Sequence, residues 1–151
     1  MFNRFLSVEY AKKHAFNYNN DYYDFNALGG DCTNFVSQCL YAGGIAMNFA
    51  KNGWYYLNLN NRAPAWTGVE EFWNFGIKNK GVGLKLTPRR INELEIADII
   101  QLGNGSEFYH TLLVTEVKNG KIFVSAHTKN AFNVPLNDYA FNTLRCAAPS
   151  T

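Results

Sequence analysis

The sequence has little of what would place the protein in several common classes. It holds only three cysteines, Cys32, Cys39 and Cys146, and this odd, sparse count excludes the disulfide framework of small secreted domains. One bridge between Cys39 and Cys146 stays open as an alternative. No apolar run reaches the roughly 20 residues of a membrane-spanning helix, and residues 1–4 do not lead into the apolar core of a signal peptide.

Charge and metal-binding spacings are also scarce. The net charge is +2, and the basic pair Arg89-Arg90 follows a proline in a segment that we expect to be a loop. This excludes the basic surface typical of nucleic-acid-binding proteins. None of the cysteine and histidine spacings matches a zinc site, so we expect no metal and no cofactor. A chain of 151 residues can form its own core, and we expect one domain over residues 1–151 and a monomer.

The most informative stretch is a Gly-Gly turn that runs into a helix beginning at Cys32. Gly29 and Gly30 permit backbone conformations that other residues resist, and Asp31 is a strong helix N-cap. The positive end of the helix dipole favours a thiolate at Cys32. A cysteine at such a position is more often a small apolar packing residue, and this interpretation is the alternative.

Periodicity predicts the other elements. Apolar spacing favours helices over residues 5–16, with His14 on the solvated side, and over residues 68–79. The helix that starts at Cys32 presents an apolar stripe that includes Cys39, and Gly43-Gly44 ends it. Strands are predicted at 97–102, 108–117, 121–127 and 142–146. The fold class is therefore α+β, with a helix packed on an antiparallel sheet.

Aromatic residues are dense between the second helix and the first strand. Trp54 and Trp66 lie in this region, which lacks clean periodicity. Aromatic side chains on loops often hold extended polar ligands, and they equally often fill the core. Both interpretations stay open for these two tryptophans.

The Asn119-Gly120 pair predicts a tight hairpin that brings two histidines together. If these are the two loop residues, Leu112 faces His127 across the ladder. His110 and His127 then become diagonal neighbours on one face, within roughly 7–8 Å, while Asn130 points away. A cysteine at a helix start with a histidine on a strand is the arrangement that nucleophilic catalysis needs, because a base must take the thiol proton.

The run from Gly30 to Gln38, with Tyr41-Ala42-Gly43-Gly44 after it, resembles the putative amidase domain of bacterial cell-envelope proteins. That family is a branch of the papain-like cysteine hydrolases related to the NlpC and CHAP types. Further matching pieces span nearly the whole chain: Tyr22-Tyr23-Asp24-Phe25, Ala65-Trp66-Thr67, Ala97-Asp98-Ile99-Ile100-Gln101, His110-Thr111 and Val124-Ser125-Ala126-His127-Thr128.

The resemblance implies a papain-like fold with Cys32 as nucleophile, His110 as base and His127 as the residue that orients the base. Asn130 is the alternative for the third position. The resemblance also implies a polar residue near the oxyanion site, for which Tyr23 is the first candidate and Tyr22 the second. Asp31 is expected to support the site, and Trp54, Trp66 and Tyr109 are expected to contact the substrate.

The implied activity is hydrolysis of an amide of bacterial peptidoglycan through a thioester. The bond is either the sugar-to-peptide amide or one within the stem peptide, and the protein is expected outside the cell or at its wall, with a phage lysin or a leaderless effector as the alternatives. A peptidoglycan-binding module without catalysis is a second hypothesis, and a toxin-like deamidase or transferase is a third. Intact Cys32, His110 and His127 favour the enzyme.

Overall fold

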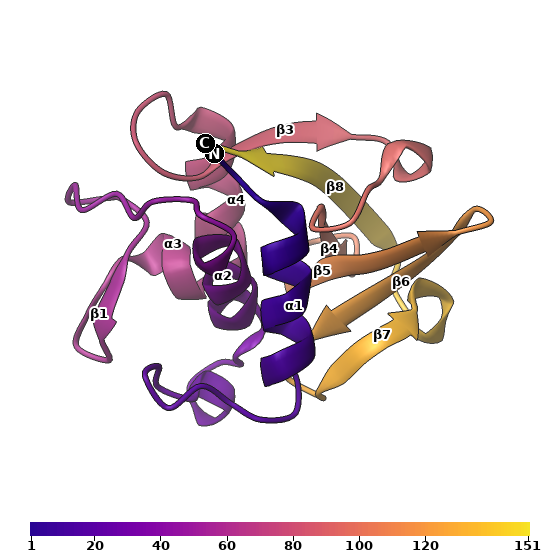
Figure 1. Cartoon of the computed structure of the whole chain (residues 1–151), viewed down its shortest axis with the longest axis horizontal. Helices are drawn as coiled ribbons and strands as arrows, with labels where there is room; N and C mark the ends of the chain where they lie inside the picture. The colour runs from indigo at the N-terminus through magenta and orange to yellow at the C-terminus, as the bar shows by residue number, and fades with distance from the viewer.

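A six-stranded antiparallel sheet, covered on one face by helices, forms the centre of the computed structural model, which describes all 151 residues (Figure 1). The sheet order is β3-β8-β4-β5-β6-β7, and β1 and β2 form a separate two-stranded sheet. In chain order the elements are α1 (Arg4–His14), η1 (Phe25–Ala27), α2 (Cys32–Ala42), β1 (Tyr56–Asn58), β2 (Asn61–Arg62), α3 (Pro64–Thr67), α4 (Val69–Lys78), β3 (Lys85–Arg89), η2 (Ile91–Glu93), β4 (Ile99–Gly103), β5 (Phe108–Lys118), β6 (Lys121–Ala126), β7 (Ala131–Pro135), η3 (Leu136–Asp138) and β8 (Thr143–Ser150).

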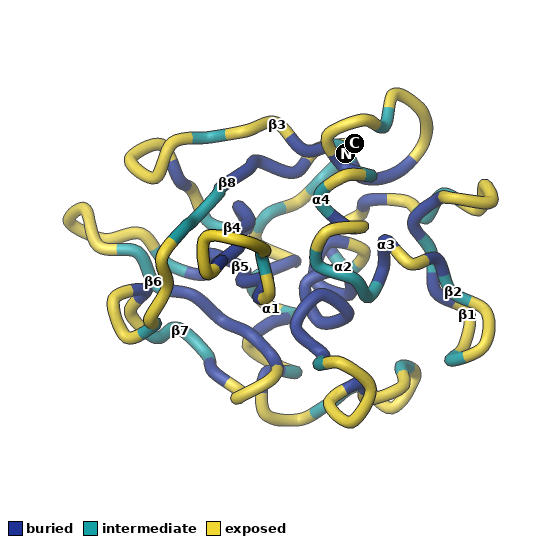
Figure 2. The backbone as a smooth tube through the Cα atoms, turned by 180° about the vertical axis from the view of Figure 1, so that it is seen from behind, coloured by how far each residue is buried: buried dark blue, intermediate teal, exposed yellow.

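Two apolar clusters lie on opposite faces of this sheet. Successive side chains of a strand point to opposite faces, so Leu113 joins the cluster under the helices and Leu112 joins the other. The helix-side cluster is the larger and includes Phe35 and Trp66, while Leu136 of η3 belongs to the second cluster. Figure 2 shows that buried positions follow the sheet and α2, and that exposed positions gather at the turns.

The three cysteines are all free and buried. Cys39 lies in the helix-side cluster and Cys146 in the cluster on the other face, so the sheet separates them. The alternative of a bridge between them is therefore wrong. No helix has the length and apolar character needed to cross a membrane.

The helix that begins at Cys32, the helix near 68–79 and the four predicted strands are all present, and the α+β class with an antiparallel sheet is confirmed. Helix α1 covers Arg4–His14, within two residues of the prediction. The sequence of these elements has strong apolar periodicity or a clear turn motif. Such patterns predict structure well because the apolar face of the element is the face that becomes buried.

Besides β1 and β2, two strands of the six-stranded sheet were not predicted, and both lie at its edges. Strand β3 contains Arg89, which we expected in a loop, and Pro88. Proline lacks the N–H that a central strand needs, but an edge strand has one side without a partner. Strand β7, at the other edge, ends in Pro135 and includes Asn133 with a left-handed φ of 56°. Proline and asparagine are typical of turns, so their presence in β3 and β7 argued against a strand in the sequence.

The β5–β6 hairpin has the predicted turn but not the predicted register. Asn119 and Gly120 both have positive φ, and Lys118 pairs with Lys121. A bulge at Thr115 then shifts the ladder by one residue, so that Val114 pairs with Val124. A shift of one residue moves later side chains to the opposite face. The prediction that His110 and His127 share a face is therefore wrong.

Candidate functional site

Cys32 occupies the first position of α2 and is 6% exposed. The chain reaches it through Gly29 and Gly30, whose φ values of 94° and 105° suit only glycine. The sulfur lies 3.8 Å from the Thr33 hydroxyl and also receives hydrogen bonds from the backbone of Thr33 and Thr111. A tight turn thus aims the thiol at strand β5.

Burial raises the pKa of the Cys32 thiol, although the hydrogen bonds from Thr111 and Thr33 act in the opposite direction. Removal of water around a sulfur disfavours its charged form, and here this effect exceeds those contacts. Burial thus opposes the thiolate that the helix dipole favours. Any attack by this sulfur requires a group that takes its proton.

Asp31 precedes Cys32 but does not cap the helix. Its buried carboxylate accepts hydrogen bonds from the Phe25 amide at 2.8 Å, from Asn34 Nδ2 at 2.9 Å and from His127 Nδ1 at 2.5 Å. Asp31 occupies the predicted N-cap position, but the expected side-chain cap is absent, because these partners bind the carboxylate instead of the amide groups of the first turn. The backbone amide of Cys32 consequently donates no hydrogen bond to the Asp31 carboxylate.

His127 is bound at both ring nitrogens. Nδ1 meets Asp31, and Nε2 lies 2.9 Å from the carbonyl oxygen of His14. Both partners are hydrogen-bond acceptors, and the carboxylate of Asp31 is the shorter contact of the two. The ring is also stacked between Tyr18, at 3.7 Å between centroids, and Phe35, at 4.0 Å. The structure does not bring His127 to His110, and His127 instead joins α1, α2 and the end of β6.

His110 lies on the other face of the sheet. Its ring is 9% exposed, and its centroid is 5.8 Å from that of Tyr139. Burial lowers the pKa of His110 to about 4, so the imidazole is neutral near neutral pH. No fully buried side-chain nitrogen or oxygen of the chain lacks a hydrogen-bond partner. The His110 nitrogens have no such partner, and they therefore reach the surface.

Cys32 contacts the backbone of the residue that follows His110. The backbone of Thr111, the residue after His110, contacts the Cys32 sulfur. No hydrogen bond joins that sulfur to the ring of His110 or of His127. The structure thus places the predicted nucleophile against the backbone next to the predicted base, while the ring of that base lies on the other face of the sheet.

The polar residues of the cysteine helix have structural partners. The Thr33 hydroxyl lies 2.8 Å from that of Thr111, and Asn34 Oδ1 accepts from the Trp66 indole at 3.0 Å. Ser37 accepts from the Trp54 indole at 3.1 Å. Both indoles are fully buried, so the prediction that Trp54 and Trp66 contact substrate is wrong. The amide and hydroxyl side chains on the inner face of α2 thus accept the indole N–H hydrogen bonds of the two buried tryptophans.

The predicted tyrosines separate into two groups. Tyr22 packs inward against Trp66, and burial raises its pKa to about 12. Tyr23 is 40% exposed, its hydroxyl has no hydrogen-bond partner, and its backbone is fixed by Tyr56 and Asn34. Tyr109 is half-exposed, and its hydroxyl donates to the Ala140 carbonyl. Only Tyr23 and Tyr109 thus have aromatic surface open to a ligand.

Three residues that support the cysteine turn were not predicted. Thr128 Oγ1 accepts from the Asp31 amide at 2.8 Å. Tyr18 stacks on His127 and donates from its hydroxyl to Asn130 Oδ1 at 2.6 Å, which places Asn130 at the surface beyond this stack. Phe35 closes the other side of the ring. The aromatic loop before the cysteine was the available signal for Tyr18, because aromatic side chains pack flat on a buried imidazole.

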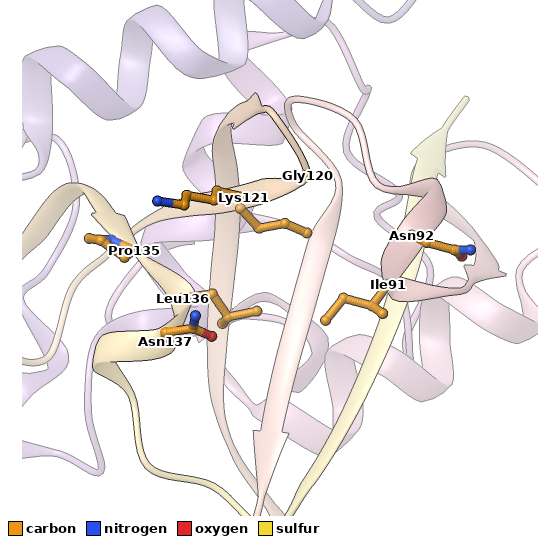
Figure 3. Close-up of a pocket in the computed structure, with 8 residues that line it drawn as sticks. Ile91, Asn92, Gly120, Lys121, Pro135, Leu136 and Asn137 are labelled. Carbon is orange, nitrogen blue, oxygen red and sulfur yellow. The ribbon is translucent and has the colours of Figure 1, made fainter.

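A hollow of about 260 Å³ lies at the far end of the β5–β6 hairpin (Figure 3). Ile91 and Leu136 point toward each other across it, and Lys121 is its only ionisable side chain. It contains no cysteine, histidine or carboxylate side chain. No three histidine, cysteine, aspartate or glutamate side chains of the chain gather in a way that could hold a metal ion.

In comparisons with known proteins, residues 1–146 match the family described as "Putative amidase domain". The chain is 27% identical over 140 residues to YjcM and 31% identical over 134 residues to YhbB, two uncharacterized proteins of Bacillus subtilis (strain 168). These matches cover 87% and 84% of the chain but only 32% and 42% of the relatives, so the chain spans less than half of each. No solved structure gives a significant match.

Replacement of His127 by alanine is expected to lower the free energy of unfolding by about 3–5 kcal/mol, because it leaves the Asp31 carboxylate buried without a cation. Urea unfolding of His127→Ala and wild type measures this. His14→Ala is the matched control, since it keeps the backbone carbonyl that His127 contacts. Equal losses in the two variants would show that the ion pair is not the cause.

The lowered pKa of His110 predicts that this residue contributes to the loss of folding stability at acidic pH. Between pH 6.5 and about 4 the unfolded chain binds a proton at His110 that the folded chain does not, so stability falls as pH falls through this window. The shift corresponds to roughly 3 kcal/mol. In urea titrations at pH 7.5 and 4.0, His110→Gln should lose correspondingly less stability than wild type. Parallel losses would contradict the buried neutral imidazole.

The raised pKa of Cys32 predicts slow alkylation in the absence of substrate. At pH 8 iodoacetamide should modify Cys32 more slowly than it modifies free glutathione, and the rate should still rise above pH 9, because only the thiolate reacts. Mass spectrometry of the modified peptide separates Cys32 from Cys39 and Cys146. A rate that is already constant below pH 7 would mean that a thiolate–imidazolium pair exists.

Proposed function

Because the chain belongs to the putative amidase domain family, we propose that it is an amide hydrolase that uses Cys32 as its nucleophile and acts on bacterial peptidoglycan. The observation that carries the proposal is the contact between the Cys32 sulfur and the backbone of Thr111, beside His110. A thiol at a helix start and a histidine on the strand that this thiol contacts are the groups that cysteine hydrolases of papain-like fold require.

The neutral state of both groups sets the order of proton transfers. As the Cys32 sulfur bonds to the amide carbonyl carbon, its proton passes to His110, and the carbonyl π electrons move to oxygen. The tetrahedral intermediate then expels the amine, which takes the proton from His110, and a thioester remains. Water attacks the thioester with His110 as base, which releases the carboxylic acid and restores the thiol.

The oxyanion of the intermediate needs donors that are free before the reaction. The Cys32 amide fits this role because the carboxylate of Asp31 is held by Phe25, Asn34 and His127. The free hydroxyl of Tyr23 is the second candidate donor. His127 acts in this scheme through Asp31, as a positioning residue, and not on the base.

Peptidoglycan as substrate and the cell wall as site of action rest on the resemblance of the cysteine stretch to envelope amidases. The bond is either the sugar-to-peptide amide or one within the stem peptide. A module that binds peptidoglycan without cutting it is the second candidate function, and the 6% exposure and raised pKa of Cys32 favour it.

Incubation with purified muropeptides, followed by mass spectrometry of new termini, tests the proposal. Wild type should release one defined product, and Cys32→Ala should release none. Cys39→Ala is the matched control, because this cysteine is fully buried in the helix-side core and should leave the product unchanged. Tight binding to sacculi without any cleavage would favour the binding module, and release of ammonia from a protein substrate would favour a deamidase.

A further inference from the structure

The turn between β6 and β7 has an unfavourable backbone for its sequence. Ala126 pairs with Ala131, and between them Thr128 and Lys129 have φ values of 58° and 64°. Consecutive left-handed residues form the turn that Asn-Gly normally supplies, as at Asn119-Gly120. A left-handed conformation is unfavourable for an ordinary residue, and a β-branched threonine is rare there. Such strain persists where it positions side chains for function.

Thr128 has a clear structural use and Lys129 does not. The Thr128 hydroxyl accepts from the Asp31 amide and donates to Asn26 Oδ1 at 3.2 Å, so it fixes the cysteine turn. Lys129 is exposed and takes part in no side-chain hydrogen bond or ion pair. The strained turn therefore delivers one free ammonium group beside the site.

Lys129 lines a cavity of about 440 Å³ together with Asp138 and Tyr139. Tyr139 forms one wall of this cavity and is also the aromatic neighbour of His110, at 5.8 Å between ring centroids. Asp138 is the second charged group of the lining, and it makes no ion pair with Lys129. Alanine and valine side chains also line the cavity and supply an apolar surface.

We propose that this cavity is a substrate subsite for an amino acid group that carries both a free carboxylate and a free ammonium. Lys129 binds the carboxylate, Asp138 binds the ammonium, and the ring of Tyr139 packs on the methylene groups between them. Two unpaired opposite charges in one cavity with apolar lining complement such a group, whereas a neutral sugar would use neither charge. As a subsite for the reaction at Cys32, the proposal rests on the proposed function.

Binding to the Cys32→Ala protein tests the subsite without catalysis. The probes are 2,6-diaminopimelate, pimelate, which lacks the amines, and 1,5-diaminopentane, which lacks the carboxylates. NMR titration should show amide shifts at Lys129 and Tyr139, with diaminopimelate bound at least tenfold more tightly than either analogue. Equal affinities for the three probes, or shifts confined to other parts of the chain, would overturn the proposal.

Charge variants assign the two ends of the ligand. Lys129→Met should weaken diaminopimelate and pimelate but not diaminopentane, and Asp138→Asn should weaken diaminopimelate and diaminopentane but not pimelate. Lys118→Met, an exposed lysine in the other hairpin, is the matched control and should change none of the three. An equal effect of Lys118→Met would show that net charge alone governs binding.

Cleavage assays keep the two proposals apart. If wild type cuts muropeptides with a free carboxylate at least tenfold faster than amidated ones, and Lys129→Met removes this preference, both proposals hold. Cleavage of both substrates at equal rates would overturn the subsite alone. Absence of any cleavage would count against the hydrolase, and the binding titration would still decide the subsite.

Discussion

The buried pair between Asp31 and His127 is the interaction on which the cysteine turn depends. Both side chains are almost fully buried, and each would be costly there without the other. Asp31 belongs to the start of α2, while His127 follows β6 and contacts the end of α1 through the His14 carbonyl. One ion pair thus fixes three segments that are far apart in the sequence around the residue that bears the thiol.

The same pair also explains why the helix start is open. An aspartate directly before a helix normally accepts the first amide hydrogens. Here His127 and Asn34 draw the carboxylate inward, so the amide of Cys32 is left to other acceptors. Some stability of the helix is given up at that end, and the positively polarised end of α2 is available where the proposed oxyanion would form.

Much of the fold could be predicted because its signals are local. The helix of Cys32 and the Asn119-Gly120 turn depend on residues next to each other, and both formed as expected. The positions of the histidines depend on the bulge at Thr115, a residue that looks like any other strand residue. One added residue in a ladder has no sequence signature, yet it decides which face every later side chain occupies.

The state of the site could not be predicted for a related reason. The dipole of α2 favours a thiolate, and this effect is visible from sequence. Desolvation acts in the opposite direction and depends on how closely β5 covers the sulfur, which only the folded chain determines. The tryptophans were ambiguous in the same way, since Asn34 and Ser37 become their partners only when the helix packs.

The prolines and left-handed residue of the outer strands restrict how peptides can associate with the protein. Pro88 in β3 cannot offer an amide hydrogen, and in β7 Pro135 and the left-handed Asn133 interrupt the extended row of donors and acceptors. An incoming peptide strand therefore finds no continuous edge with which to extend the sheet. Recognition of a peptide chain must then rely on side chains and hollows, and two copies of the sheet are kept from joining into a longer one.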